Sequence, residues 1–175
     1  MRGGEKSPAR KPFSKILWSF VGALVGIYLI SVLNRYFYGD IQNALFLVGS
    51  FGASAVLIYG APQAEFSQPR NLVGGHIVSA LVGVSVYKYL NFDVMMLSAL
   101  AVSLSTIVMH YTRTLHPPGG ATALIAVIGN ERVHEAGYMF ALLPIAVGVT
   151  VLLLVAVIVN NLSSNPKRHY PRYWL

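Results

Sequence analysis

A short turn, His116-Pro117-Pro118-Gly119-Gly120, carries the residues best suited to chemistry in this chain. Proline suits the first turn of a helix, because the N–H that it lacks would have no partner there. Two glycines leave the helix start open, so a ligand can approach the free backbone N–H groups and the positive end of the helix dipole. Such a helix start is typical of anion-binding sites. The turn therefore predicts an anion site, although a plain connection between two helices would use the same residues.

Basic and hydrogen-bonding residues gather around this turn and around a second one like it. The second turn is followed by Gly74-Gly75, as the first ends in Gly119-Gly120. Glu65 is the one carboxylate expected on the same face, so positive groups outnumber it. The alternative to substrate binding is that an arginine there only extends to a lipid phosphate. The predicted substrate-binding residues are Arg113, His116, Gly119, Gly120, Thr122, Arg70, Asn71, Gly75 and His76.

Metal binding and catalysis are less well supported by the residue pattern. His76, His110 and His116 could form a zinc site with Glu65, but no two of these histidines are three or four residues apart. Neighbouring arginines would also repel a cation. The chain has no cysteine, and the sequence predicts neither a metal nor another cofactor. No paired carboxylates or nucleophile–base set is expected at membrane depth, so we do not expect an enzyme.

Composition assigns the chain to the integral membrane proteins. Of its 175 residues, 55% are hydrophobic and 11% are charged, whereas a soluble domain has about 25% charged residues. Lipid must therefore cover much of the surface. The net charge of +7 does not indicate nucleic acid, because eight of the thirteen Lys and Arg residues lie in two tails that flank apolar segments. The predicted fold class is an all-α polytopic transmembrane helix bundle.

The apolar pattern predicts about six membrane segments between two basic tails. The tails are residues 1–15, expected to be disordered, and residues 162–175, with Tyr170, Tyr173 and Trp174 expected at the membrane interface. The transmembrane domain covers residues 16–161. One segment is short for a bilayer core of about 30 Å, so it either crosses inside a protein shield or re-enters. The predicted helices are 16–34, 41–60, 72–90, 94–110, 117–128 and 137–161.

Local signals refine this arrangement. Gly22 and Gly26 form a GxxxG pattern, which indicates helix packing, and Pro144 predicts a kink in the last helix. Basic tails predict that both termini lie in the cytoplasm, which requires an even number of crossings. The expected location is a bacterial plasma membrane. The two Gly-Gly turns also suggest a parallel internal repeat, although a shared need for glycine at helix starts would look the same.

Three sequence blocks, taken in order, resemble the signature blocks of the HPP family of integral membrane proteins. They are residues 49–55, residues 68–76 and the Thr112–Leu124 stretch that contains the His-Pro-Pro tripeptide. The resemblance implies a compact domain usually described as four-spanning, and it implies nitrite transport. Some members carry C-terminal nucleotide-sensing domains. This chain ends soon after its last apolar segment, so we expect it to lack them.

The residues and the resemblance together predict membrane transport of a small inorganic anion, with nitrite as the first candidate. The expected partners are that anion, the lipid bilayer and further copies of the chain. The alternative is a structural or assembly subunit of the membrane without transport activity.

Overall fold

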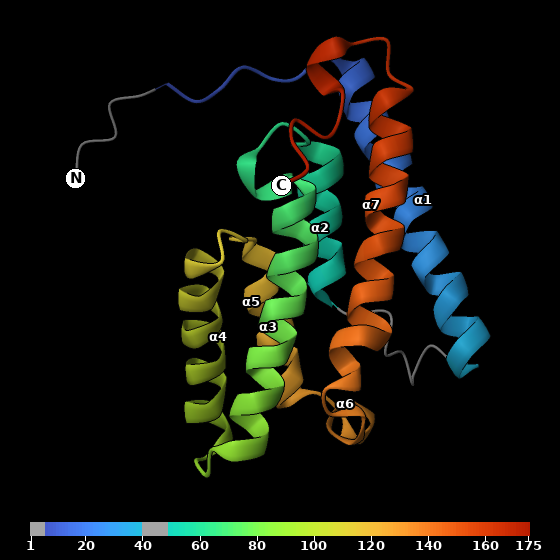
Figure 1. Ribbon diagram of the computed structural model, residues 1–175. Helices are drawn as coiled ribbons and strands as arrows, with labels where there is room; N and C mark the ends of the chain where they lie inside the picture. The colour runs from blue at the N-terminus through green and yellow to red at the C-terminus, as the bar shows by residue number, and fades with distance from the viewer. Residues whose placement is uncertain (1–5, 40–48) are drawn as a thin grey trace.

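The computed structural model describes residues 6–39 and 49–175, and every regular element within them is helical (Figure 1). The predicted all-α bundle is confirmed. The longer elements are α1 (Phe13–Tyr38), α2 (Gly49–Gly60), α3 (Pro69–Tyr89), α4 (Val94–Tyr111), α5 (Pro117–Ile128), α6 (Glu131–Ala136) and α7 (Val147–Asn161). Shorter turns are the 3₁₀ segments η2 (Glu65–Ser67) and η4 (Pro166–Arg168) and the π-helical η3 (Ala141–Ala146).

The predicted starts of α4 and α5 are confirmed, whereas α3 begins at Pro69, three residues before its predicted start at residue 72. The structure begins α5 at Pro117 and α4 at Val94, where the Asp93 side chain accepts from two backbone N–H groups. It begins α1 at Phe13, three residues before the predicted start. The predicted helix 41–60 ends as expected at Gly60, while its residues 41–48 lie outside the described part of the chain. The short helix α6 was not predicted.

Pro144 bends the last membrane segment, as predicted. Leu143, just before it, has a non-helical backbone with φ −125° and ψ 107°. Pro144 has no N–H to donate, and its ring pushes aside the carbonyl that lies one turn before it in the chain. The backbone therefore widens into a π-helical turn there. The segment then continues as α7.

The lengths of the apolar helices explain why the chain can be described with either six membrane segments or four spans. Four helices of the described chain are long and apolar enough to cross a bilayer: α1, α3, α4 and the continuous Ala141–Asn161 segment. The other two apolar helices, α2 and α5, are shorter. With twelve residues, α5 is about 18 Å long. It runs antiparallel beside α4 and leads to α6 at the opposite end of the bundle (Figure 1).

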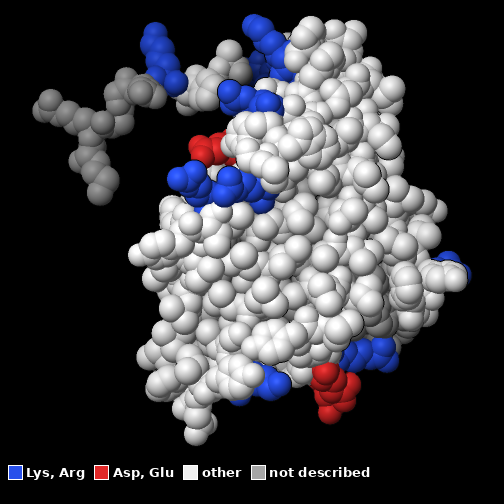
Figure 2. All heavy atoms as spheres, in the orientation of Figure 1, with Lys and Arg blue, Asp and Glu red and all other residues white. Residues whose placement is uncertain are grey.

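Charged side chains gather at the two ends of the bundle. Figure 2 shows Lys and Arg concentrated near the chain termini, mixed basic and acidic groups at the opposite end, and an intervening surface with almost no charge. On that surface α1 exposes large apolar side chains, among them Phe20, Leu24 and Tyr28, each more than half exposed. Such a continuous apolar band is covered by lipid in a polytopic membrane protein.

Glycines set the close approach of the helices. A Cβ at Gly75 would lie 2.6 Å from the His116 Cβ, and one at Gly119 would lie 2.9 Å from the Gly75 carbonyl oxygen. On α1, Gly22 and Gly26 both face the ring of Tyr59, which confirms the predicted packing role of this pair. Small residues let helix backbones touch in lipid, where hydrophobicity gives no driving force for association.

The C-terminal end of α2 is closed by side chains from four other segments. In a helix the last carbonyls have no partner within the helix, and lipid supplies none. Here every one of the last four accepts a hydrogen bond. The donors are Ser67 to Leu57 (3.2 Å), Asn160 to Ile58 (3.0 Å), Ser19 and Arg168 to Tyr59 (2.7 and 2.6 Å) and Lys11 to Gly60 (2.7 Å).

The segment after α7 folds back onto this end of α2. Arg168 is 3% exposed and Tyr170 is 2% exposed. The Tyr170 hydroxyl donates to the Ser67 carbonyl at 2.7 Å, and burial raises the pKa of this tyrosine. The prediction that Tyr170 lies at the membrane interface is therefore wrong for this residue, because its ring packs inside the protein. Trp174 is exposed.

Adjacent glycines at the start of α5 allow a matched test of this packing. We expect Gly119→Ala to lower the melting temperature clearly, because the added Cβ would meet Ser79 Oγ at 2.8 Å and a backbone oxygen at 2.9 Å. Overpacking of this kind costs about 1–3 kcal/mol. Gly120→Ala should be tolerated, since its nearest neighbour, Val102, lies at 3.7 Å. Thermal unfolding in detergent compares the two, and equal melting temperatures would contradict the close approach.

Candidate functional site

Six polar side chains lie together in the interior of the bundle, and each is fully buried. We call this cluster the polar core. It takes two residues from each of α2, α3 and the start of α5, so three helices build it. Its members are Ser50, Ser54, His76, Ser79, His116 and Thr122.

Hydrogen bonds join five of the six into one network. The Ser54 Oγ lies 2.7 Å from Nε2 of His76 and 2.8 Å from Nε2 of His116. Nδ1 of His76 lies 2.7 Å from the Thr122 Oγ1, which in turn bonds the Ser50 Oγ at 2.8 Å. The two imidazole rings are 5.0 Å apart between centroids. Ser54 is therefore the link between the two histidines.

Helix periodicity explains how the sequence places these groups. Ser50 and Ser54 are four residues apart on α2, and His76 and Ser79 are three apart on α3, so each pair shares one helix face. His116 is the N-cap of α5, with an extended backbone (φ −139°, ψ 105°). This conformation turns its ring toward α2 and η2, and Nδ1 bonds the Phe66 carbonyl at 2.6 Å.

The partners fix the hydrogens when both imidazoles are neutral. A carbonyl can only accept, so Nδ1 of His116 donates to Phe66 and Nε2 of His116 accepts. In this order the single hydroxyl hydrogen of Ser54 points to His116 rather than to its other acceptor, the Ser50 carbonyl at 3.1 Å. Nε2 of His76 consequently donates to Ser54, and its Nδ1 accepts from Thr122. This order uses all four ring nitrogens.

Ser79 is the one member of the polar core whose hydroxyl has no partner among the described residues. It is fully buried and lies against Gly119. A buried hydroxyl without a hydrogen bond costs about 1–3 kcal/mol. Buried groups of this kind commonly bind a water or an ion. Ser79 therefore keeps one buried hydroxyl in the polar core that could bond an additional group.

The start of α5 offers fewer free N–H groups than the sequence suggests. Pro117 and Pro118 have none, and the Gly119 N–H donates to the His116 carbonyl at 2.8 Å. The side of Gly119 that was expected to admit a ligand lies against Gly75 and Ser79. Both glycines keep their place beside the polar core, and their role in binding an anion stays a prediction. Side chains, rather than backbone, supply most of the hydrogen bonds here.

Arg113 lies outside the polar core, on an exposed turn at the end of α4. Its φ is +56°, the left-handed conformation that usually requires glycine. The turn closes through two backbone bonds, from Arg113 N–H to the His110 carbonyl and from Thr114 N–H to the Met109 carbonyl. An arginine in this conformation costs about 1 kcal/mol relative to an ordinary turn residue. The sequence thus has an arginine at position 113, where a cation was predicted to bind the anion, in spite of this backbone strain.

The other two predicted residues hold the turn rather than the polar core. Arg70 donates from Nη2 to the Thr112 carbonyl at 3.0 Å, and Asn71 donates to the Leu115 carbonyl at 2.8 Å. Both bonds tie the start of α3 to the turn before α5.

A pocket of about 280 Å³ opens beside this turn, and we call it the turn pocket. Phe66 forms part of its wall and also supplies the carbonyl that bonds His116, so the pocket adjoins the polar core. Two cationic or titratable side chains and one carboxylate line it. Its lining residues are Glu65, Phe66, Asn71, Met109, His110, Arg113 and Leu115.

His76 and His116 thus come together, while His110 and Glu65 line the turn pocket instead. Within the described ranges, 6–39 and 49–175, no three His, Asp or Glu side chains are grouped as metal ligands. The four-ligand zinc alternative finds no such cluster in that part of the chain.

Sequence reasoning missed the three serines of the polar core. Ser50 and Ser54 entered the sequence analysis only as members of the 49–55 block, without a role of their own. Their four-residue spacing, and the three-residue spacing of Ser79 from His76, are the signals that could have found them. Each pair places hydroxyl or imidazole groups on one face of an otherwise apolar helix.

Comparison with known proteins supports the resemblance noted in the sequence. The profile described as "HPP, transmembrane region" matches residues 8–171, nearly the whole chain. The chain belongs to the HPP family. Two similar relatives are transmembrane proteins of Dictyostelium discoideum, 46% and 43% identical over 99% and 98% of this chain. The chain spans 55% and 60% of the length of these relatives, and no solved structure matches it.

In this HPP protein, substitutions at Arg113 separate the effect of its backbone conformation on stability from the effect of its charge. We expect Arg113→Gly to keep or raise the melting temperature, because glycine adopts a positive φ without strain. Arg113→Ala should not give the same gain, since alanine keeps the strained conformation. Thermal unfolding of both variants in detergent checks this. A clear loss of stability in the glycine variant would mean that the guanidinium itself stabilises the turn.

Proposed function

We propose that this HPP protein carries a small inorganic anion across the membrane through the polar core, with nitrite as the first candidate. The observation that carries the proposal is a buried cluster of hydroxyl and imidazole groups, one of them unpartnered, inside a bundle that has four helices long and apolar enough to cross a bilayer. Polar groups at membrane depth are costly and usually mark a substrate path.

The electrostatics of the cluster favour an anion over a cation. All four carboxylates of the described residues, Glu65, Asp93, Glu131 and Glu135, are exposed. None is a hydrogen-bond partner of the polar core. Hydroxyl and imidazole N–H groups can donate to an anion, and an anion can accept several such bonds at once.

A second arrangement of the hydrogens brings a positive charge into the polar core. In it the Thr122 hydroxyl donates to Ser50, so Nδ1 of His76 must donate to Thr122. Ser54 has one hydrogen and cannot donate to both Nε2 atoms, so both of these contacts are hydrogen bonds only when one imidazole carries a second proton. That imidazolium would have no carboxylate partner in the core. A bound anion would supply the missing charge, which supports entry of the anion together with a proton.

The turn pocket provides the approach to the core in this proposal. Arg113 and His110 attract an anion at its wall, and Phe66 lies between the pocket and His116. Glu65, at the same pocket, is the one carboxylate there and would oppose a high local concentration of anions. We propose that this end faces the cytoplasm, because the basic residues of both tails lie at the same end of the bundle.

Three further points extend the proposal. We propose transport rather than catalysis, and a homo-oligomer rather than a monomer, since a chain of this size encloses little of a pathway by itself. The bacterial plasma membrane stays a prediction, and the relatives named above come from Dictyostelium. A structural subunit without transport activity is the outcome that the flux experiment below would favour if every anion failed.

Ser54→Ala tests the polar core with a matched control. In proteoliposomes we expect nitrite influx to fall at least about tenfold, because the link between the two imidazoles is lost. Ser98→Ala is the control, since Ser98 also bonds a carbonyl four residues earlier but is exposed on α4. Nitrate and chloride, offered separately, measure selectivity.

The outcomes of this flux experiment are distinct. Wild-type and Ser98→Ala protein should transport equally, and melting temperatures show that Ser54→Ala still folds. Nitrite influx in Ser54→Ala equal to that of wild type would place the path elsewhere. No flux of any anion above protein-free liposomes would count against transport altogether.

Proton coupling makes a separate prediction. We expect an inward proton gradient to accelerate anion influx through the wild-type protein, and the anion to carry protons that a pH-sensitive dye inside the liposome detects. His116→Gln keeps a hydrogen-bonding side chain but cannot hold the extra proton, so its residual flux should not respond to the gradient. Protein-free liposomes correct for permeation of the neutral acid. A wild-type rate independent of the gradient would contradict the coupling.

A further inference from the structure

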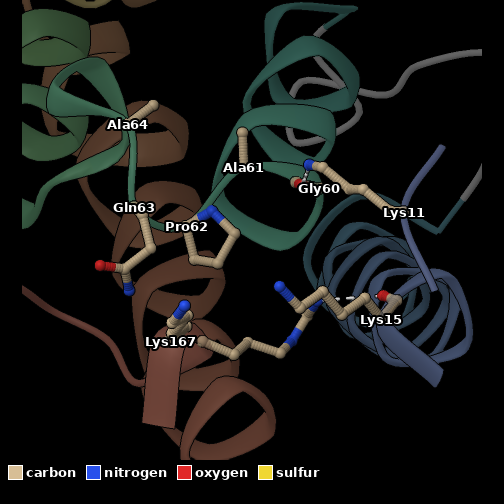
Figure 3. A pocket seen from close by; sticks show the side chains of 9 residues that line it. Lys11, Lys15, Gly60, Ala61, Pro62, Gln63, Ala64 and Lys167 are labelled. Atoms are coloured by element: carbon tan, nitrogen blue, oxygen red, sulfur yellow. Dashed lines mark hydrogen bonds between the residues drawn. The ribbon is translucent and has the colours of Figure 1, made fainter. Parts of the chain in front are cut away.

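A second basic feature lies at the end of the bundle where the two terminal segments meet, away from the polar core. It is a pocket of about 240 Å³ between the start of α1, the end of α2 and η4, and we call it the terminal pocket. Figure 3 shows the side chains of Lys11, Lys15 and Lys167 around it. The full lining is Lys11, Lys15, Gly60, Ala61, Pro62, Gln63, Ala64, Lys167 and Arg168.

Four of these nine residues are cationic and none is acidic. Like charges close together repel each other, so a pocket lined in this way favours an anion. The C-terminal end of α2, which forms part of the pocket wall, carries a partial negative charge worth about half a charge. Lys11 and Arg168 already bond carbonyls there, at Gly60 and Tyr59. The remaining positive charge is not balanced by protein groups in the described chain.

Two of the ammonium groups are available to a ligand. Neither Lys15 nor Lys167 has a side-chain hydrogen bond or ion pair with any described residue, and Lys15 is half-buried. By contrast, Lys11 Nζ donates to Gly60. The two free groups come from opposite ends of the chain, so one ligand between them would bridge the N-terminal and C-terminal segments.

Arg168 gives an independent indication of a ligand. It is 3% exposed and lines the pocket, yet its Nε has no partner in the described structure. Its other donors are used: Nη1 bonds the Lys15 carbonyl at 3.0 Å, and Nη2 bonds the Tyr59 carbonyl at 2.6 Å. Burial lowers the pKa of this guanidinium, as it does for a cation removed from water without a counter-ion.

We infer that the terminal pocket binds a phosphate-bearing anion held by Lys15, Lys167 and Arg168. Phosphate presents several strong acceptor oxygens to Lys and Arg donors, and its charge would offset the excess of cations. The same chemistry is available from an anionic lipid headgroup and from free phosphate. The inference does not depend on anion transport through the polar core.

Thermal unfolding of the full chain in neutral detergent tests the inference. The two probes are millimolar inorganic phosphate, compared with chloride at equal ionic strength, and mixed micelles that contain a phosphatidic acid, compared with micelles of phosphatidylcholine. At least one probe should raise the melting temperature by about 3 °C or more, the shift expected from about 1 kcal/mol for a chain of this size. The Lys15→Gln/Lys167→Gln double variant should lose most of that shift. Lys88→Gln, at the opposite end of the bundle, is the matched control and should respond as wild type does.

The two probes distinguish the source of the ligand. A shift with phosphatidic acid alone would identify the lipid headgroup, and a shift with inorganic phosphate alone would identify a soluble ligand. No shift with either probe, or an equal shift in the wild type and the double variant, would overturn the inference. Lys167 is exposed, Lys15 is half-buried, and neither forms a hydrogen bond or ion pair with a described residue through its side chain. The double variant should therefore fold, and its melting temperature without ligand confirms that.

Discussion

The end of α2 is the constraint on which much of this structure depends. Among its last four carbonyls, only that of Leu57 accepts from a backbone N–H of the described chain, that of Ala61, so side chains of other segments supply the further donors. Those donors come from α1, η2, α7 and η4, and each bond fixes one of these segments against α2. The terminal segments are therefore part of the folded core. The terminal pocket arises from the same requirement, because the cations that cap α2 converge there.

The polar core follows from a similar conflict between helix packing and buried polarity. Glycines at positions 75 and 119 let α3 and α5 approach each other closely. That approach brings His76, His116 and Thr122 within reach of two serines on α2. A neutral network can then be fully bonded in the interior, with Ser79 left over. The unpartnered hydroxyl of Ser79 lies beside these closely packed helices. A small ligand that entered there would gain a hydrogen bond that the protein does not supply.

Local signals made the helices predictable, and tertiary contacts made the site harder to predict. Asp93 caps α4, Pro117 starts α5 and Pro144 bends the last segment, and each acts through its own backbone. Sequence also indicated that His76 and His116 belong to one site. It could not indicate that Ser54 joins them, because that contact spans 62 residues to His116. Tyr170 was misplaced for the same reason, since its partner is the carbonyl of Ser67.

The C-terminal segment has a mechanical consequence for longer chains of the family. Arg168 and Tyr170 hold the end of α2 and the turn after it, and Ser50 and Ser54 lie one to three turns earlier on that same helix. Tension applied beyond residue 171 would therefore act on α2 directly, and also on α1 and α7, which the same two residues bond. A domain joined at this end would therefore be coupled to α2, the helix that carries two serines of the polar core.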